Sequence, residues 1–368
     1  MVNPEISLFL QERIDANDFP SAVYLVWEKG EIRFQDALSY AVVEPERIPA
    51  KLDTIYDLAS LTKVLVTGLL GGKLVRAGKL ESDAPFLNYL APLEAEDKSN
   101  ITVQELAAHV SGSTGWLPFY LLVSERSEVM AEILRVPLLE VERRVVYSDL
   151  NFITLMFIIE RLVDERIDEA ARRMIFEPLG LADTYFNPPI DLRHRIAASE
   201  KGNQYEYQTC RELGFDAQGP LRTHQIWGEV HDGNAYFMDG VSGHAGLFGT
   251  AEDVLRIAQQ FLPGYSTMFE GADFELFTKN ITPGMNEHRS FGFQLATSPE
   301  STAGKQMSPQ SFGHLGFTGT SLWIDPVAQR IFILLTNRTH HHPLPFININ
   351  TTRRTFHDLA IAALDANK

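Results

Sequence analysis

The sequence predicts an α+β fold in which an antiparallel β-sheet is built from both ends of the chain and flanked by helices. Two observations lead to this prediction: strand-like apolar runs lie near both ends of the 368 residues, and mainly helical segments with long loops lie between them. The simplest division places residues 1–61 and 286–368 in a sheet lobe, and residues 62–285 in an inserted, mainly helical lobe. A chain of this length can bury a large core and form a cleft between two lobes.

A helix and two strands are predicted first. Apolar residues on one face favour a helix over residues 5–16, which the Phe19-Pro20 pair ends. The apolar runs 22–27 and 32–38 predict two strands, and Lys29-Gly30-Glu31 predicts the hairpin turn between them. These strands form the N-terminal part of the predicted sheet.

Helices are predicted next, and strands return near the C-terminus. A long helical stretch begins at residue 61 and runs to about residue 77, where Gly78 gives a stop signal. Further helices are predicted over residues 103–109, 150–163, 251–261 and 351–364. Short apolar runs predict strands over residues 291–296, 313–317, 321–324 and 331–335.

Charge and composition exclude several classes of protein. The formal net charge is −16, and we find no basic stripe, so a nucleic acid is not an expected partner. Cys210 is the only cysteine, so no internal disulfide can form. The N-terminus lacks the basic and apolar regions of a signal peptide, and no apolar stretch is long enough to span a bilayer. We expect a soluble protein, with its compartment and oligomeric state left open.

A serine at the start of an apolar helix is the first chemical signal. Ser60-Leu61-Thr62-Lys63 reads S-x-x-K, and Ser60 is the only serine with a lysine three residues later. The helix is apolar on almost every face, which predicts that it is buried. A lysine in an apolar wall loses part of its preference for the charged form and can accept a proton. The alternative is an ordinary N-cap serine with a solvated lysine.

A tyrosine before a second apolar helix is the next signal. Tyr147-Ser148-Asp149 precedes residues 150–156, and a nearby cation such as Lys63 would help the phenol to ionise. The alternative is a half-buried tyrosine with Ser148 or Asp149 as the helix N-cap. Tyr185 offers a competing match, but no buried helix follows it. Tyr147 is therefore preferred.

A glycine-punctuated strand forms the third signal. Residues 314–321, from His314 through Gly316 and Gly319, combine strand-forming and small residues. Glycine at such a position can let a substrate backbone approach closely. The alternative is a simple strand followed by a turn.

Taken in order, Ser60-x-x-Lys63, Tyr147-Ser148-Asp149 and His314-x-Gly316 resemble the motifs of the serine β-lactamase and penicillin-binding family. The chain looks most like the class-C-related serine hydrolases, a group that includes esterases, D-aminopeptidases and muropeptide amidases. The resemblance extends over nearly the whole chain and includes residues 106–112, 178–184, 228–235, 243–248 and 336–340. It implies a β-lactamase/transpeptidase-like fold.

The resemblance also implies roles for individual residues. Ser60 is the implied nucleophile, which forms an acyl-enzyme that water hydrolyses. Lys63 and Tyr147 share the proton transfers, and which of them is the resting proton acceptor stays open. The backbone amides of Ser60 and Phe317 are the implied oxyanion donors. No metal or other cofactor is required.

Two departures from the family pattern bear on the substrate. His314 and Leu315 stand where the family has a lysine and a hydroxyl residue, so a site for a substrate carboxylate is weakened. Asp149 replaces the more usual asparagine; its carboxylate favours protonated Lys63, repels an anionic substrate and could also keep His314 charged. Arg338 could restore an anion site, the alternative being a solvated arginine at a strand end. The expected substrate-binding residues are therefore Asp149, His314, Gly316 and Arg338.

The sequence thus predicts a serine hydrolase that cleaves an ester or amide through an acyl-enzyme. The expected substrate is a small molecule or a peptide, such as a cell-wall-derived peptide or muropeptide. Turnover of β-lactams and of D-Ala-D-Ala peptides is expected to be weak, and esters or amides without a terminal carboxylate are expected to fit better. The alternatives are a catalytically silent binding or regulatory protein on the same fold, and a true β-lactamase or DD-peptidase.

The histidines outside the three motifs are not expected to bind a metal or to act in catalysis. The run His340-His341-His342 lies on an extended segment, where neighbouring side chains point in opposite directions and do not close on one ion. No metal site is expected there. His231 and His244 lie in glycine-rich loops and are expected to pack those loops rather than act as catalysts.

Overall fold

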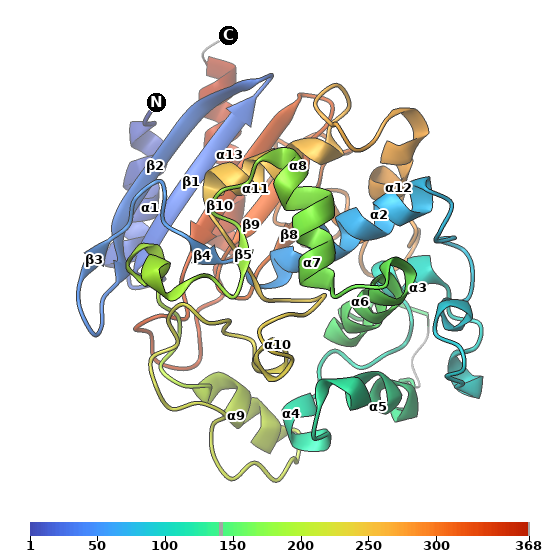
Figure 1. The fold of residues 1–368 in the computed structure, drawn as a ribbon. Coiled ribbons are helices and arrows are strands. Elements are labelled where there is room, and N and C mark those ends of the chain that lie inside the picture. Colours follow the sequence, from blue (N-terminus) through green and yellow to red (C-terminus); the bar gives the residue numbers. More distant parts are fainter. Residues whose placement is uncertain (140–142, 367–368) are drawn as a thin grey trace.

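The central feature of the structure, a computed structural model that describes residues 1–139 and 143–366, is a seven-stranded antiparallel sheet. Its strand order is β3-β2-β1-β10-β9-β8-β7, so the central pair joins the two ends of the chain, with Leu25 opposite Ile333 (Figure 1). The predicted α+β class and the sheet built from both termini are confirmed. The strands are β1 (Ser21–Glu28), β2 (Glu31–Val42), β3 (Ile48–Pro49), β7 (Gln294–Leu295), β8 (Phe312–Leu315), β9 (Ser321–Asp325) and β10 (Arg330–Thr336).

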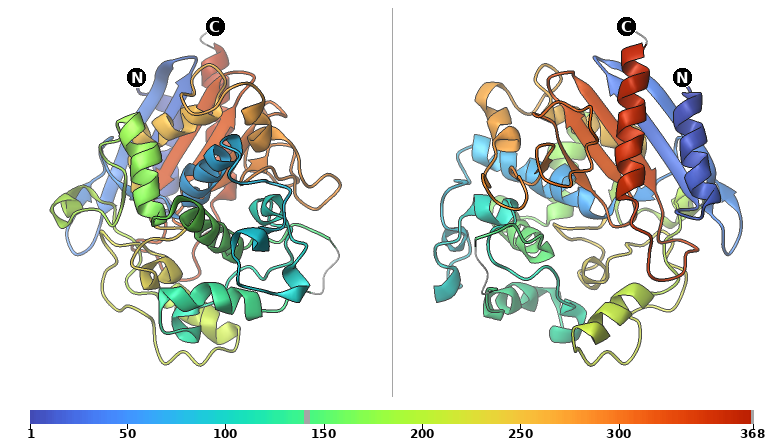
Figure 2. Two further views of the ribbon diagram at one scale, coloured as in Figure 1. Left: turned by 45° about the vertical axis from the view of Figure 1, so that its right-hand side comes forward. Right: turned by 180° about the vertical axis from the view of Figure 1, so that it is seen from behind.

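Helices cover both faces of the sheet, and this explains its apolar centre. Every residue of β1 and of β10 is buried, as expected for strands packed on both sides. Helices α1 (Pro4–Asp15) and α13 (Asn350–Ala366) lie side by side on the outer face (Figure 2). Their apolar residues, including Leu10 and Phe356, pack with Trp323 in one buried cluster.

The opposite face carries the larger core. Helices α2 (Leu69–Arg76), α6 (Asp149–Val163) and α11 (Ala251–Ala258) contribute to one continuous apolar cluster with the inner side chains of the sheet. Helix α6 is apolar almost all round, so it is buried inside the inserted segment. Thr250 caps α11 by accepting a hydrogen bond from the amide of Asp253 at 3.3 Å.

Shorter elements fill the inserted part of the chain. A small sheet of order β4-β6-β5 comprises β4 (Tyr56–Asp57), β5 (Tyr185–Phe186) and β6 (Leu247–Gly249). The remaining α-helices of the described residues are α3 (Val103–Ala107), α4 (Phe119–Leu122), α5 (Val129–Arg135), α7 (Ile167–Ala171), α8 (Glu177–Leu179), α9 (Gln204–Glu212), α10 (Gly233–Phe237) and α12 (Glu275–Thr278). Among these same residues, none of the helices combines the length and the apolar character needed to cross a membrane.

Two predicted elements differ from the structure. The strand predicted over 291–296 is reduced to β7, because Gly292 adopts φ +90° and the amide of Ser290 donates to the carbonyl of Phe293, which turns the chain. The helix predicted from residue 61 begins as a 3₁₀ turn (Ala59–Leu61), continues as a π-helical segment (Lys63–Gly68) and becomes α-helical only in α2. Such π-helical segments are frequent at functional sites.

Candidate active site

Ser60 lies in a strained turn between β4 and α2. Ala59, the residue before it, has φ +48°. Residues other than glycine rarely adopt this left-handed backbone conformation, and it recurs at functional sites. The hydroxyl of Thr62 stabilises the turn, because it donates to the carbonyl of Ala59 at 2.6 Å and accepts from the amide of Leu247 at 3.1 Å. Strand β6 therefore holds the turn in place.

Lys63 lies one turn after Ser60 and is fully buried. Its Nζ is 3.0 Å from Ser60 Oγ, 3.0 Å from the carbonyl oxygen of His244 and 2.7 Å from Oδ1 of Asp149. The structure therefore brings Ser60, Lys63 and Asp149 together. The carbonyl of His244 completes the set of oxygens around the ammonium group, and no pattern in the sequence indicated it.

Tyr147 lies beside the same ammonium group. The Nζ of Lys63 is 5.0 Å from the centre of the Tyr147 ring, and Arg289 lies 5.5 Å from that centre. The ring also packs on His109, with centroids 4.5 Å apart. The competing Tyr185 lies in β5 and donates its hydroxyl to a backbone carbonyl. Of the two tyrosines, Tyr147 is the one that lines the cavity with Ser60.

The charge on Lys63 is set by its neighbours. Burial alone lowers the pKa of Lys63, but the Asp149 carboxylate and the Tyr147 hydroxyl outweigh burial and raise it above the ordinary value. The expectation that Asp149 favours protonated Lys63 is therefore confirmed. In the resting site, Lys63 donates its hydrogen bond to Ser60 Oγ.

The expectation that Asp149 could keep His314 charged is wrong. Burial above all, and then the charges of Arg289 and Lys63, hold the pKa of His314 well below its ordinary value. Its Nδ1 lies 2.8 Å from the carbonyl oxygen of Leu315 and donates to it, so Nε2 carries the lone pair. Within the described chain, Nε2 is buried without a hydrogen-bond partner. His314 therefore presents a neutral side chain to the cavity.

The end of β8 lies against the Ser60 turn. Within the described residues, the backbone amide of Phe317 meets no acceptor, so it can donate to a substrate oxygen. A Cβ on Gly316 would lie 2.7 Å from the carbonyl oxygen of Leu58 and closer still to the side chain of Thr320. The glycine therefore makes room for the protein's own chain, and that it also lets a substrate approach stays a prediction.

Two arginines beside Phe317 bring positive charge to the cavity. Arg338 is not a solvated strand-end residue, because its Nε donates to the carbonyl of Phe317 at 2.6 Å and burial lowers its pKa to about 10. Arg353, from α13, donates to the carbonyls of Gly316 and Thr320 at 2.8 and 3.0 Å, and burial lowers its pKa to about 9. Neither forms a salt bridge within residues 1–139 and 143–366, so both charges lack a carboxylate partner. The motifs did not indicate Arg353.

One group near Ser60 has the composition of a metal site. Ligand atoms of Asp149, Asp232 and His244 lie within 4.8 Å of one another, and His244 Nε2 is 3.0 Å from Asp232 Oδ1. The ammonium group of Lys63 already supplies positive charge to this group. His340 is occupied elsewhere: its Nε2 accepts from the amide of Val43 at 2.9 Å, and its Nδ1 lies 2.9 Å from a backbone carbonyl.

These side chains meet in one cavity of about 750 Å³. Its walls come from the Ser60 turn, the start of α6, the end of β8, α9, the loop before α10 and the start of α13. Residues that line it include Ser60, Trp116, Tyr147, Asp149, Tyr205, Glu206, His231, Asp232, Arg289, His314, Gly316, Phe317, Arg338 and Arg353. All predicted site residues except buried Lys63 therefore line this one cavity, and Lys63 contacts Ser60 from below its surface.

Solved structures with the same fold span nearly the whole chain. EstCE1, described as a hydrolase with promiscuous acyltransferase activity, has a TM-score of 0.71 at 20% identity and covers 96% of this chain and 97% of its own. A penicillin-binding protein homologue from Caulobacter crescentus has a TM-score of 0.74 at 18% identity, covering 99% and 98%. A class C β-lactamase from Rhodobacter sphaeroides has a TM-score of 0.71 at 18% identity, covering 98% and 99%. These likenesses concern the fold.

Sequence relatives are more similar. A protein of Escherichia coli (strain K12) named "Putative D-alanyl-D-alanine carboxypeptidase" is 30% identical over 369 residues, which cover 91% of this chain and 82% of that protein. A protein of the same name from Salmonella gallinarum is 32% identical over 365 residues, covering 90% and 82%. The family model described as Beta-lactamase matches residues 7–351. The chain therefore belongs to the β-lactamase family and is a serine hydrolase of that family.

Proposed function

We propose that this protein cleaves an ester or amide bond in a cell-wall-derived peptide or muropeptide through an acyl-enzyme on Ser60. The observation that carries the proposal is the 3.0 Å contact between Ser60 Oγ and Lys63 Nζ at a cavity that Tyr147 also lines. A hydroxyl with a buried amine beside it, at a cavity that a phenol also lines, is one arrangement that can activate a nucleophile.

The proposed reaction has two halves. The Lys63–Tyr147 pair first gives up one proton to solvent; Ser60 Oγ then attacks the substrate carbonyl carbon while its own proton passes to that pair, and the pair returns a proton to the leaving group as the C–O or C–N bond breaks. Water then cleaves the acyl ester and regenerates Ser60. The amides of Ser60 and Phe317 bind the oxyanion in both halves, and such donors contribute about 3–4 kcal/mol each in comparable hydrolases.

Two arginines without a carboxylate partner among the described residues favour a peptide that carries a carboxylate, whereas His314, Leu315 and Asp149 led us to expect a substrate without one. Arg338 and Arg353 stay protonated at neutral pH, since burial lowers their pKa values only to about 10 and about 9, and a carboxylate would supply the missing counter-charge. The name carried by the E. coli and Salmonella relatives agrees with such a substrate. A flexible peptide end can extend from Ser60 toward these arginines.

Weak turnover of β-lactams remains part of the proposal. His314 is held neutral by burial and Leu315 has no hydrogen-bonding side chain, so neither assists a carboxylate held rigidly beside β8. A bicyclic β-lactam cannot extend its carboxylate as a flexible peptide can. Efficient hydrolysis of nitrocefin would overturn this part and favour a true β-lactamase.

A fluorophosphonate probe with intact-mass detection tests the nucleophile. We expect a single adduct on the wild-type chain and none on Ser60→Ala, with Ser148→Ala as a matched control that keeps the adduct, because Ser148 donates its hydroxyl to the Thr114 carbonyl. Absence of an adduct on the wild type under all conditions would support the silent binding protein instead. Assays with p-nitrophenyl esters, nitrocefin, D-Ala-D-Ala peptides and muropeptides then rank the substrates.

A further inference from the structure

We infer that Asp57 is a positioning residue that holds the two halves of the oxyanion site in register. This inference rests on the proposed acyl-enzyme function, since it concerns the amides of Ser60 and Phe317. These amides belong to chain segments more than 250 residues apart, so some contact must fix their relative position. Asp57, at the end of β4, is buried and lines the catalytic cavity without being assigned a role by any motif.

The first contact of Asp57 is to the nucleophile turn. Its Oδ1 accepts a hydrogen bond from the amide of Ala59 at 2.9 Å. Ala59 is the residue with the left-handed backbone directly before Ser60. A conformation of this kind persists only where surrounding contacts enforce it, so the carboxylate helps to orient the Ser60 amide.

The second set of contacts reaches the other half of the site. The carbonyl oxygen of Asp57 accepts from the hydroxyl of Thr318 at 2.8 Å, and Thr318 directly follows Phe317. The neighbouring carbonyl of Leu58 accepts from the hydroxyl of Thr320 at 3.1 Å. Both bonds attach the turn after β8 to the segment that leads into Ser60.

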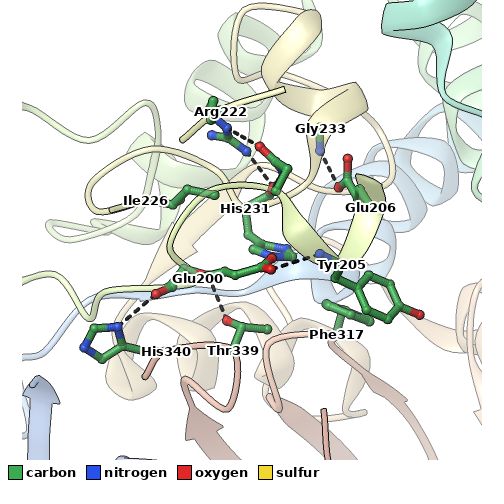
Figure 3. A network of polar contacts seen from close by, with 12 residues as sticks. Glu200, Tyr205, Glu206, Arg222, Ile226, His231, Gly233, Phe317, Thr339 and His340 are labelled. Carbon is green, nitrogen blue, oxygen red and sulfur yellow. Dashed lines mark hydrogen bonds and ion pairs between the residues drawn. The ribbon is translucent and has the colours of Figure 1, made fainter. Parts of the chain in front are cut away.

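The third contact acts through His231. Oδ2 of Asp57 accepts from the backbone amide of His231 at 2.8 Å, and the imidazole of His231 stacks on the Phe317 ring with planes 18° apart and centroids 5.5 Å apart. Figure 3 shows His231 between Glu200 and Phe317, and its Nε2 lies 2.8 Å from Glu200 Oε2. Asp57 therefore contacts Ala59, which precedes Ser60, and Thr318, which follows Phe317. It also contacts the backbone of His231, whose imidazole packs on Phe317.

An asparagine cannot replace this carboxylate fully. Its amide offers one oxygen, and its NH₂ group would face the amide of Ala59 or of His231, so one of the two bonds is lost. Removing an oxyanion donor lowers kcat by about 10²–10³. Because Asp57→Asn displaces the donors without removing them, we expect kcat to fall by about tenfold to a hundredfold, with KM for a neutral p-nitrophenyl ester nearly unchanged.

Asp325→Asn is the matched control. Asp325, the last residue of β9, is also buried; it accepts the backbone amides of Val327 and Ala328 in the turn after β9 and that of Ser308 in the segment before β8, but it is not among the residues that line the cavity. We expect it to lower the melting temperature as Asp57→Asn does while kcat per active site stays at the wild-type value. Active sites are counted by fluorophosphonate titration, which separates slow catalysis from loss of folded protein.

A second variant and an inhibitor separate positioning from a general effect on folding. Thr318→Val removes the bond to the Asp57 carbonyl and should lower kcat in the same way, and the double variant should lose less than the product of the two factors. The affinity for phenylboronate, whose tetrahedral serine adduct places an oxygen at the oxyanion position, should fall by the same factor as kcat. Equal kcat in Asp57→Asn and Asp325→Asn, with equal phenylboronate affinity, overturns the inference; failure of wild-type labelling at Ser60 overturns the proposed function instead.

Discussion

At the scale of single residues, the ion pair between Lys63 and Asp149 controls the proton chemistry of the site. The Nζ–Oδ1 distance is 2.7 Å and the pKa of Lys63 is raised, so at neutral pH the amine is an ammonium. An ammonium cannot accept the proton of Ser60. Either Lys63 first loses a proton or another group accepts the proton from Ser60, and these two routes differ in their pH dependence.

Asp149→Asn should separate the two routes. Without the carboxylate, burial dominates and the pKa of Lys63 falls, so the rising limb of kcat/KM against pH should move to lower pH and activity at pH 7 should increase. Asp149→Glu, which keeps the charge, should leave the limb near its wild-type position. The measurement is a pH–rate profile with a neutral ester; an unmoved limb in Asp149→Asn means that Lys63 acts throughout as an ammonium.

Arg338 allows a test of the substrate's charge. Its side chain faces the cavity without a carboxylate partner among the described residues, so Arg338→Gln removes a charge that a carboxylate substrate would meet. The ratio of kcat/KM for a carboxylate-bearing ester to that for its neutral methyl ester should fall about tenfold, the equivalent of about 1.4 kcal/mol. The ratio cancels any shared effect on Phe317, and Arg338→Lys should retain most of it. An unchanged ratio argues against an anionic substrate group at this wall.

At the scale of elements, local sequence patterns predicted most helices and strands. They also predicted those contacts of the site that form between residues of one element. Ser60 and Lys63 meet because three residues make nearly one helical turn, which the sequence shows directly. The carbonyl of His244 contacts Lys63 across 181 residues, and Arg353 of the C-terminal helix reaches the turn after β8, so only the tertiary structure brings them there. The strand predicted over 291–296 was shortened by a turn at Gly292 that apolar composition alone does not indicate.

The outer helical layer supplies an element-scale prediction about stability. Phe356 of α13 is fully buried and lies edge-on to Tyr24, with centroids 5.9 Å apart, on the face of the sheet occupied by α1. Phe356→Ala should lower the free energy of unfolding by about 3–5 kcal/mol through lost burial and a cavity. Because this cluster is separate from the core that contains the Ser60 helix, kcat per titrated active site should stay unchanged. Val327→Ala, at a 65% exposed position, is the control that should leave stability nearly as it is.

At the scale of the whole molecule, the sheet from both chain ends and the inserted segment together enclose the cavity. The division into residues 1–61 with 286–368 and residues 62–285 stays a prediction. The three predicted motifs come from both parts: Ser60 precedes α2, Tyr147 precedes α6, and His314 lies in β8. The net charge of −16 belongs to the whole chain, whereas Arg338 and Arg353 place two positive charges without a carboxylate partner among the described residues on the cavity wall.

The dependence of kcat/KM on salt concentration should show whether the net negative charge or the two arginines have the larger effect on the binding of an anionic substrate. At an ionic strength of 0.01 M the Debye length is about 30 Å, so the negative net charge of the protein repels an approaching anion. At 0.15 M the Debye length is about 8 Å, and this repulsion is largely screened. The buried arginines act only over short distances inside the cavity. We therefore expect kcat/KM for a carboxylate-bearing ester to rise between these salt concentrations, while the neutral methyl ester changes little. Measurement of both esters in the same NaCl series checks this, and a falling rate for the anionic ester would show that the arginines dominate the long-range field instead.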